Sequence, residues 1–172
     1  MSEPIYFMVY DTSIGDITIS SRGGDIIGLQ FGNKEVEGGI RGESEILFEA
    51  IQQINQYCYA QRKQFELPLF VTGDDFTLKV YQHVISIPYG QTKTYEGVAM
   101  AIGEPGKGKE VEAALLKNPI ALLLPCHRVV KNMFLPGDYV GGAELKARIL
   151  KMERAYANKT FVAPTDYRED DE

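Results

Sequence analysis

The spacing of hydrophobic residues changes along this chain. In the first 31 residues they form short runs or alternate with polar residues, as in residues 16–20, which is the pattern of half-buried strands. From Ser44 onward they mostly recur every three or four residues, the spacing of amphipathic helices. A chain with this order is expected to fold as an α+β protein whose sheet comes first.

The N-terminal part is predicted to be a small sheet with one helix, and we place this domain at residues 1–72. Strands are expected at residues 6–10, 16–20 and 25–31, and their short turns favour an antiparallel sheet. A Gly-rich loop then leads to a helix over about residues 44–62, for which Ser44 is a suitable N-cap. Cys58 falls in this helix and is interpreted as a small, half-buried apolar side chain.

The next part, placed at residues 73–156, is predicted to be helical. Helices are expected near residues 76–87, 95–102 and 109–116, and Thr94 can cap the second of them. Two short helices joined by a tight turn are typical of helix-turn-helix domains, although many small helical proteins share the pattern. The outer face of the third helix, which carries Lys109, Ala113 and Leu116, is either a groove-binding face or an ordinary solvated one.

Charge is unevenly distributed. Residues 1–75 hold 5 basic and 12 acidic side chains, residues 76–156 hold 11 and 7, and residues 157–172 hold 2 and 5. The net charge of −6 therefore conceals a basic segment between two acidic ones. This is either ordinary variation in composition or the mark of an anionic partner such as nucleic acid. The acidic tail, residues 157–172, has the composition of a disordered segment.

Several classes of protein are not expected. No apolar run reaches the roughly 18 residues of a membrane span, and the N-terminus has no basic stretch, so neither a membrane protein nor a secretory leader is predicted. Two cysteines, Cys58 and Cys126, are too few for a disulfide framework, which favours a reducing cytoplasm. Cys126 and His127 are adjacent and poorly spaced for structural zinc, and we expect no metal or cofactor.

The strongest chemical signal is an apolar run at residues 120–124 that is followed by Pro125-Cys126-His127-Arg128. A thiol is a nucleophile only as the thiolate, and a neighbouring imidazole can take its proton while positive charge stabilises the anion. On these residues alone, Cys126 is either such a nucleophile or an inert buried cysteine.

The residues around Cys126 resemble the O6-alkylguanine-DNA alkyltransferases, also called methylated-DNA–protein-cysteine methyltransferases. The similarity covers about residues 5–156. It is carried by Pro125-Cys126-His127-Arg128-Val129, Asn118-Pro119, Ile87-Pro88-Tyr89-Gly90, Thr94-Tyr95, Tyr139, Gly141-Gly142, Leu145-Lys146 and Glu153. The resemblance implies a ribonuclease H-like N-terminal domain and a winged-helix-like C-terminal domain.

The resemblance also implies an activity. The family extrudes a damaged guanine from duplex DNA, because the target atom cannot be reached inside the stack. The expected reaction is an irreversible transfer of the alkyl group from O6-alkylguanine to Cys126, one lesion per protein, with O4-alkylthymine left open as a second substrate. The expected partner is double-stranded DNA with an alkylated guanine. The protein would act as a monomer in the cytoplasm, in the nucleoid or, in a eukaryote, in the nucleus.

Roles for individual residues follow from the same resemblance. Cys126 would be the nucleophile, His127 a water-mediated general base, and Glu153 the residue that orients it. Asn118 would hold the turn before the cysteine, and Tyr95 would donate to the departing base. Further assignments are substrate binding by Tyr139, Val129, Val140, Gly141 and Lys146, and DNA binding by Lys109, Ala113, Leu116, Thr94 and Lys107.

The sequence also departs from the family pattern. Lys109-Glu110-Val111-Glu112 stands where the family usually has Arg-Ala-Val-Gly. Lys109 keeps the charge of the arginine without its planar fork, and the two added carboxylates are expected to weaken binding to phosphates. Val140 and Ala121 replace a serine and a proline found in other members. Two alternatives therefore stand beside the repair transferase: an alkyltransferase-like protein that binds lesions without transfer, and a thiol alkyl acceptor with weak DNA binding.

Overall fold

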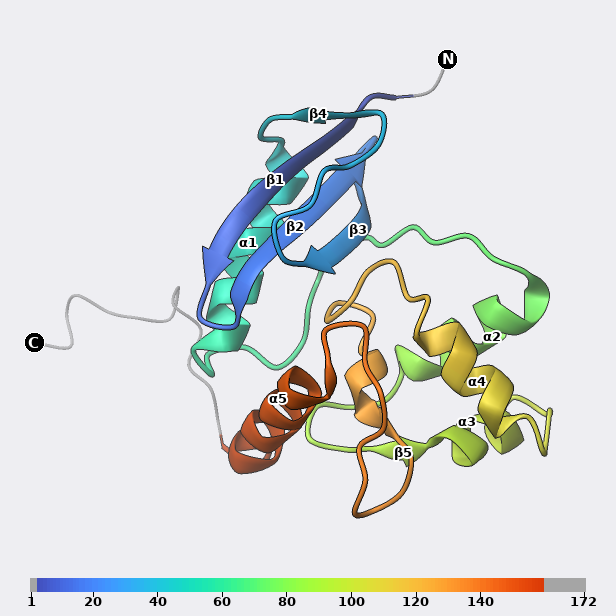
Figure 1. The fold of residues 1–172 in the computed structure, drawn as a ribbon. Coiled ribbons are helices and arrows are strands. Elements are labelled where there is room, and N and C mark those ends of the chain that lie inside the picture. The colour runs from blue at the N-terminus through green and yellow to red at the C-terminus, as the bar shows by residue number, and fades with distance from the viewer. Residues whose placement is uncertain (1–2, 160–172) are drawn as a thin grey trace, which may run out of the picture.

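The structure, a computed structural model, describes residues 3–159, so most of the predicted acidic tail lies outside the described residues. Figure 1 shows a sheet backed by one helix, followed by a helical part. The elements are β1 (Ile5–Thr12), β2 (Gly15–Arg22), β3 (Asp25–Phe31), β4 (Gly39–Arg41), α1 (Glu45–Cys58), α2 (Asp75–Val84), β5 (Lys93–Thr94), α3 (Tyr95–Ala101), α4 (Gly108–Leu115), the 3₁₀ turn η1 (Cys126–Arg128), β6 (Val129–Val130) and α5 (Ala143–Tyr156). The α+β prediction is confirmed.

The sheet has the strand order β3-β2-β1-β4. β1, β2 and β3 form the predicted antiparallel meander, but β4 pairs with β1 in parallel, so the sheet is mixed rather than antiparallel. The prediction of a loop at this place was wrong because a Gly-rich segment can approach a strand edge very closely. A Cβ atom on Gly39 would lie 2.9 Å from the Phe7 ring and 3.1 Å from the Val36 carbonyl oxygen.

The helix α1 covers one face of the sheet (Figure 1). Its apolar residues follow helical spacing and are buried against the strands: Leu47, Ala50, Ile51, Ile54 and Tyr57. The predicted N-cap is confirmed, since the Ser44 hydroxyl accepts a hydrogen bond of 3.3 Å from the Leu47 amide. This helix ends at Cys58, a few residues earlier than the sequence suggests.

The helices α3 and α4 occupy the positions of the predicted helix-turn-helix. The Thr94 hydroxyl caps α3 by accepting a 2.9 Å hydrogen bond from the Gly97 amide. On α4, the inner face is buried through Val111, Ala114 and Leu115. The predicted outer residues Lys109, Ala113 and Leu116 are exposed. The amphipathic reading of α4 is therefore confirmed.

The chain between α4 and η1 joins the helical part to the sheet. The Leu29 amide donates to the Pro119 carbonyl at 2.9 Å, and the Ala121 amide donates to the Leu29 carbonyl at 3.1 Å. Residues 120–130 are all buried in a core that both parts share, and the start of this segment pairs with the edge of β3 at Leu29. The apolar run thus places Cys126 between the sheet and the helices.

Hydrophobic spacing does not predict α5. The buried face of this helix consists of Lys146, Ile149, Leu150 and Glu153, which do recur at helical spacing. Two of these four residues are charged, so the face lacks the apolar pattern by which an amphipathic helix is recognised. The two charged residues, Lys146 and Glu153, are buried with hydrogen-bond partners in the site described next.

Candidate active site

Asn118 fixes the turn that leads to Cys126. Its Oδ1 accepts a 2.9 Å hydrogen bond from the Ile120 amide, and its Nδ2 donates to the Leu124 carbonyl at 2.9 Å. The same Nδ2 lies 3.0 Å from Cys126 Sγ and donates to it. One side chain therefore determines both the path of the turn and the surroundings of the sulfur.

The Cys126 thiol is 2% exposed. Burial raises its pKa to about 11, although the Asn118 hydrogen bond and the charge of Lys146 act in the opposite direction. The thiol is therefore protonated at neutral pH in the resting protein, and a base must remove its proton before it can act as a nucleophile.

His127 is fully buried next to the cysteine, and its Nε2 lies 2.8 Å from Glu153 Oε2. Burial lowers the pKa of His127, against the effect of the Glu153 carboxylate, so the ring favours its neutral form. An ionised carboxylate can only accept, so Nε2 carries the ring proton. Nδ1 has no hydrogen-bond partner among the described residues and remains basic.

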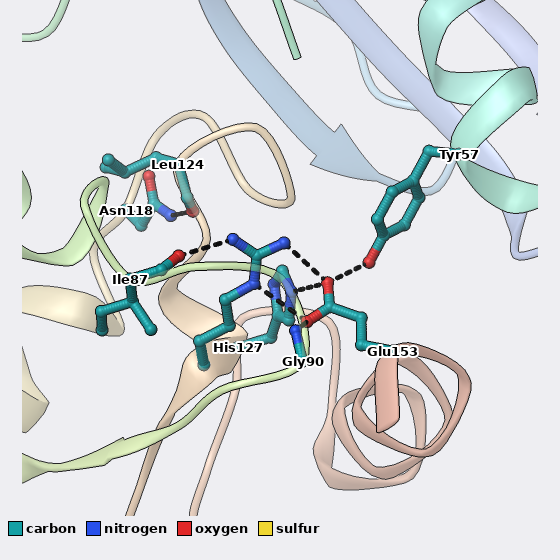
Figure 2. A network of polar contacts seen from close by, with 8 residues as sticks. Tyr57, Ile87, Gly90, Asn118, Leu124, His127 and Glu153 are labelled. Atoms are coloured by element: carbon teal, nitrogen blue, oxygen red, sulfur yellow. Dashed lines mark hydrogen bonds and ion pairs between the residues drawn. The ribbon is translucent and has the colours of Figure 1, made fainter. Parts of the chain in front are cut away.

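Glu153 is the centre of a buried network (Figure 2). Arg128 contacts its two carboxylate oxygens through Nε and Nη2, at 2.9 Å each, and binds the Ile87 carbonyl through Nη1 at 2.8 Å. The Gly90 amide donates to Oε1 at 3.4 Å. Burial by itself would raise the pKa of Glu153, but the hydrogen bonds and charges of His127 and Arg128 hold it far below its ordinary value.

Tyr57 is a member of this network that sequence reasoning missed. Its hydroxyl donates to Glu153 Oε2 at 2.5 Å, and Figure 2 shows it reaching the carboxylate from the side of α1. In the sequence it is one more apolar position on the predicted helix, 96 residues away from Glu153. No local pattern signals a contact over that distance.

The Tyr57→Phe variant is expected to be less stable by about 1.5–3 kcal/mol, because a hydrogen bond to a charged acceptor is lost in the core. Tyr81→Phe provides the matched control, since the Tyr81 hydroxyl donates at 2.9 Å to a neutral carbonyl, that of Ala114. Urea denaturation of both variants measures the difference. Equal losses of about 1 kcal/mol would show that the Glu153 charge does not strengthen the Tyr57 bond.

A cavity of only about 10 Å³ lies beside Cys126. It is lined by Tyr95, Glu112, Leu115, Leu116, Cys126, Asp138, Tyr139 and Lys146. Lys146 is 1% exposed, and its Nζ donates to the Asp138 carbonyl at 3.0 Å and to the Tyr95 hydroxyl at 3.3 Å. Burial lowers the pKa of Lys146 to about 8.

The structure brings only some of the predicted substrate-binding residues to this cavity. Tyr139 and Lys146 line it, together with Tyr95 and Cys126. Val129 is buried in β6, Val140 is 37% exposed, and Gly141 packs against Phe31, and none of the three is among the lining residues in the described structure.

The predicted DNA-binding residues lie together around α3 and α4. Lys109, Ala113 and Leu116 form the exposed face of α4, and Thr94 and Lys107 precede the first turns of α3 and α4. Lys107 also pairs with Glu104 at 3.6 Å. All five of these residues are exposed.

Residues 3–159 contain no group of three or more His, Cys, Asp or Glu side chains that could hold a metal ion. Over the same residues, no helix has the length and apolar character that a bilayer span requires.

Both parts of the chain match one protein family. Residues 5–71 match the ribonuclease-like domain of 6-O-methylguanine DNA methyltransferase, and residues 75–155 match the DNA-binding domain of the same family. These segments cover most of the chain, which belongs to the 6-O-methylguanine DNA methyltransferase family.

Individual relatives agree with this assignment. The chain is 33% identical over 157 residues to the constitutive methylated-DNA–protein-cysteine methyltransferase of Bacillus subtilis, covering 87% of this chain and 95% of the relative. It is 35% identical over 159 residues to the inducible enzyme of that organism, covering 91% and 88%. A crystal structure of Mycobacterium tuberculosis OGT in complex with DNA superposes with a TM-score of 0.82, at 29% identity and with 94% of this chain and 96% of the other covered.

Proposed function

We propose that this protein repairs alkylated DNA by transferring the alkyl group from O6 of guanine to Sγ of Cys126. The observation that carries the proposal is the buried cysteine beside a His127–Glu153 pair, placed at a cavity under the helix-turn-helix of a chain from this family. The proposed partner is duplex DNA that contains an alkylated guanine.

The reaction begins with proton removal from the thiol. His127 Nδ1 receives the proton through a bridging water, as the family resemblance implies, and the Glu153 carboxylate stabilises the resulting imidazolium. The Asn118 amide and the Lys146 ammonium stabilise the thiolate, since both favour the charged form of Cys126. These two groups therefore offset part of the free energy needed to form a thiolate in a buried site.

The thiolate then attacks the alkyl carbon. A carbon–sulfur bond forms while the carbon–O6 bond breaks, and its electron pair leaves with the guanine. We expect the Tyr95 hydroxyl to donate a proton to the departing base and to recover one from the Lys146 ammonium, from which it accepts a hydrogen bond. The products are guanine and a neutral thioether, which is a poor leaving group, so the protein reacts once.

DNA would reach the cysteine through the surface around α4. Lys107 and Lys109 supply positive charge there, and Ala113 leaves room for close approach. Because the thiol is 2% exposed, the guanine must leave the base stack and enter the cavity. The small volume of that cavity implies that its walls move when the base enters.

Intact-mass measurement after incubation with a duplex containing one O6-methylguanine tests the proposal. We expect a gain of one methyl group per protein, located on Cys126 by peptide mapping and saturating at one equivalent. An unmodified duplex is the control.

The two alternatives predict other results. Tight binding to the methylated duplex with no mass gain would indicate a protein that binds lesions without transfer. No gain from duplex, but alkylation by free O6-benzylguanine, would indicate a thiol acceptor that does not use DNA. Either result would overturn the proposal.

A further inference from the structure

Glu112 occupies an unexpected place in the structure. Sequence reasoning sets its carboxylate beside the outer face of α4, where it would meet DNA phosphates. The residue is instead partly buried, and it lines the same cavity as Cys126, Tyr95 and Lys146. Its neighbour Glu110 is exposed and does not line the cavity.

The charges around this cavity do not balance. The carboxylates of Glu112 and of the exposed Asp138 both act electrostatically on Lys146 and on Tyr95, whereas Lys146 is the single cationic side chain that lines the cavity in the described structure. Burial lowers the pKa of Lys146 to about 8, and its Nζ is hydrogen-bonded to a carbonyl and a hydroxyl oxygen. The space that would receive the O6 substituent is therefore net negative.

A fixed negative charge discriminates strongly between ligands at short range. Charges a few ångströms apart in a partly buried site interact several times more strongly than they do in water. A carboxylate on the incoming O6 substituent would be repelled by Glu112 and would lose the strong hydration of an ion. A neutral amide of the same shape would not be repelled and would lose a much weaker hydration.

We propose that Glu112 gives the cavity charge selectivity, so that guanines with a neutral or cationic O6 substituent react and guanines with an anionic one are rejected. This inference rests on the proposed function and specifies the substrate class of the same site. Glu112 acts as a specificity residue and takes no part in bond making.

The test compares two duplexes of the same sequence, one with O6-carboxymethylguanine and the other with O6-carbamoylmethylguanine. The two adducts are nearly equal in size and differ by one negative charge. The quantity measured is the ratio of the single-turnover transfer rates, neutral over anionic. Dividing the rates cancels the contribution of the DNA backbone to binding, which both duplexes share.

In the unaltered protein the ratio is expected to be about tenfold or more. Glu112→Gln is expected to reduce it several-fold, by raising the rate with the anionic adduct. Glu110→Gln, the matched control on the same helix, is expected to leave the ratio unchanged while it alters binding of both duplexes alike. If transfer is too slow to time, the same ratio is taken from equilibrium affinities for the two duplexes, measured in Cys126→Ser proteins, which lack the thiol that accepts the alkyl group.

An equal ratio in the unaltered protein and in Glu112→Gln would overturn the inference. So would a Glu112→Gln variant that gains rate equally with both adducts, because the carboxylate would then act on DNA approach. Failure of the proposed function has a different signature, namely no transfer from an O6-methylguanine duplex by any of these proteins.

Discussion

The Cys126→Ala variant is expected to gain no methyl group from an O6-methylguanine duplex under conditions that convert the unaltered protein completely. The carbon–sulfur bond cannot form without Sγ, and no other group replaces it. Intact mass after prolonged incubation is the measurement. The fold should persist, since the sulfur accepts a hydrogen bond from the Asn118 amide and truncation of one small buried side chain costs about 1–2 kcal/mol.

Cys58→Ala is the matched control. Cys58 is half-buried at the end of α1, and burial raises the pKa of its thiol. It lies outside the site, so the variant is expected to react at the rate of the unaltered protein. Residual transfer in Cys126→Ala that disappears in the double variant would assign the nucleophile to Cys58.

The Glu153→Gln variant is expected to lose about 3–5 kcal/mol of stability, because Arg128 would remain buried without a counter-charge. His127 would also lose the carboxylate that orients it, so the variant should transfer methyl groups much more slowly. Urea denaturation and single-turnover rates measure the two effects. Glu144→Gln, on an exposed position of the same helix, is the control and is expected to change stability by less than about 1 kcal/mol.

Acid titration provides a second readout for Glu153. Its pKa in the folded protein is lowered, so it contributes stability that is fully present above its ordinary value of 4.5 and is lost as the pH falls below that value. The unaltered protein should therefore lose stability steeply in this range, and Glu153→Gln should lose less. Parallel acid curves for the two proteins would mean that Glu153 is not held ionised by His127 and Arg128.

Much of the fold could be predicted from local patterns. The strands of the first 31 residues and the apolar faces of α1 and α4 rest on spacing within one element, and the structure confirms them. The expected half-burial of β2 was wrong, because its polar residues Thr18 and Ser20 are buried like Ile17 and Ile19. The strand β4 could not be predicted. It can pair with β1 because Gly39 has no side chain to collide with Phe7, and these two residues are far apart in the sequence. The helix α5 could not be predicted because its buried face is half charged.

The residues of the site also divide into those that local sequence indicates and those that depend on distant packing. Cys126 and His127 are adjacent, so one segment of sequence indicates both the thiol and a base. The position of Glu112 in the cavity, and the hydrogen bond from Tyr57 to Glu153, depend on how distant elements pack. Such contacts have no counterpart in the spacing of residues along the chain.

The segment that leads to Cys126 also covers an edge of the sheet. Strand β3 is the last in its sheet, and its outer side is occupied by backbone hydrogen bonds with Pro68, Phe70, Pro119 and Ala121. The opposite edge is β4, only three residues long. An unprotected strand edge is a template for pairing between molecules and thus for aggregation. The chain just before the nucleophile therefore covers part of this edge, and its displacement from β3 would expose strand backbone to pairing between molecules.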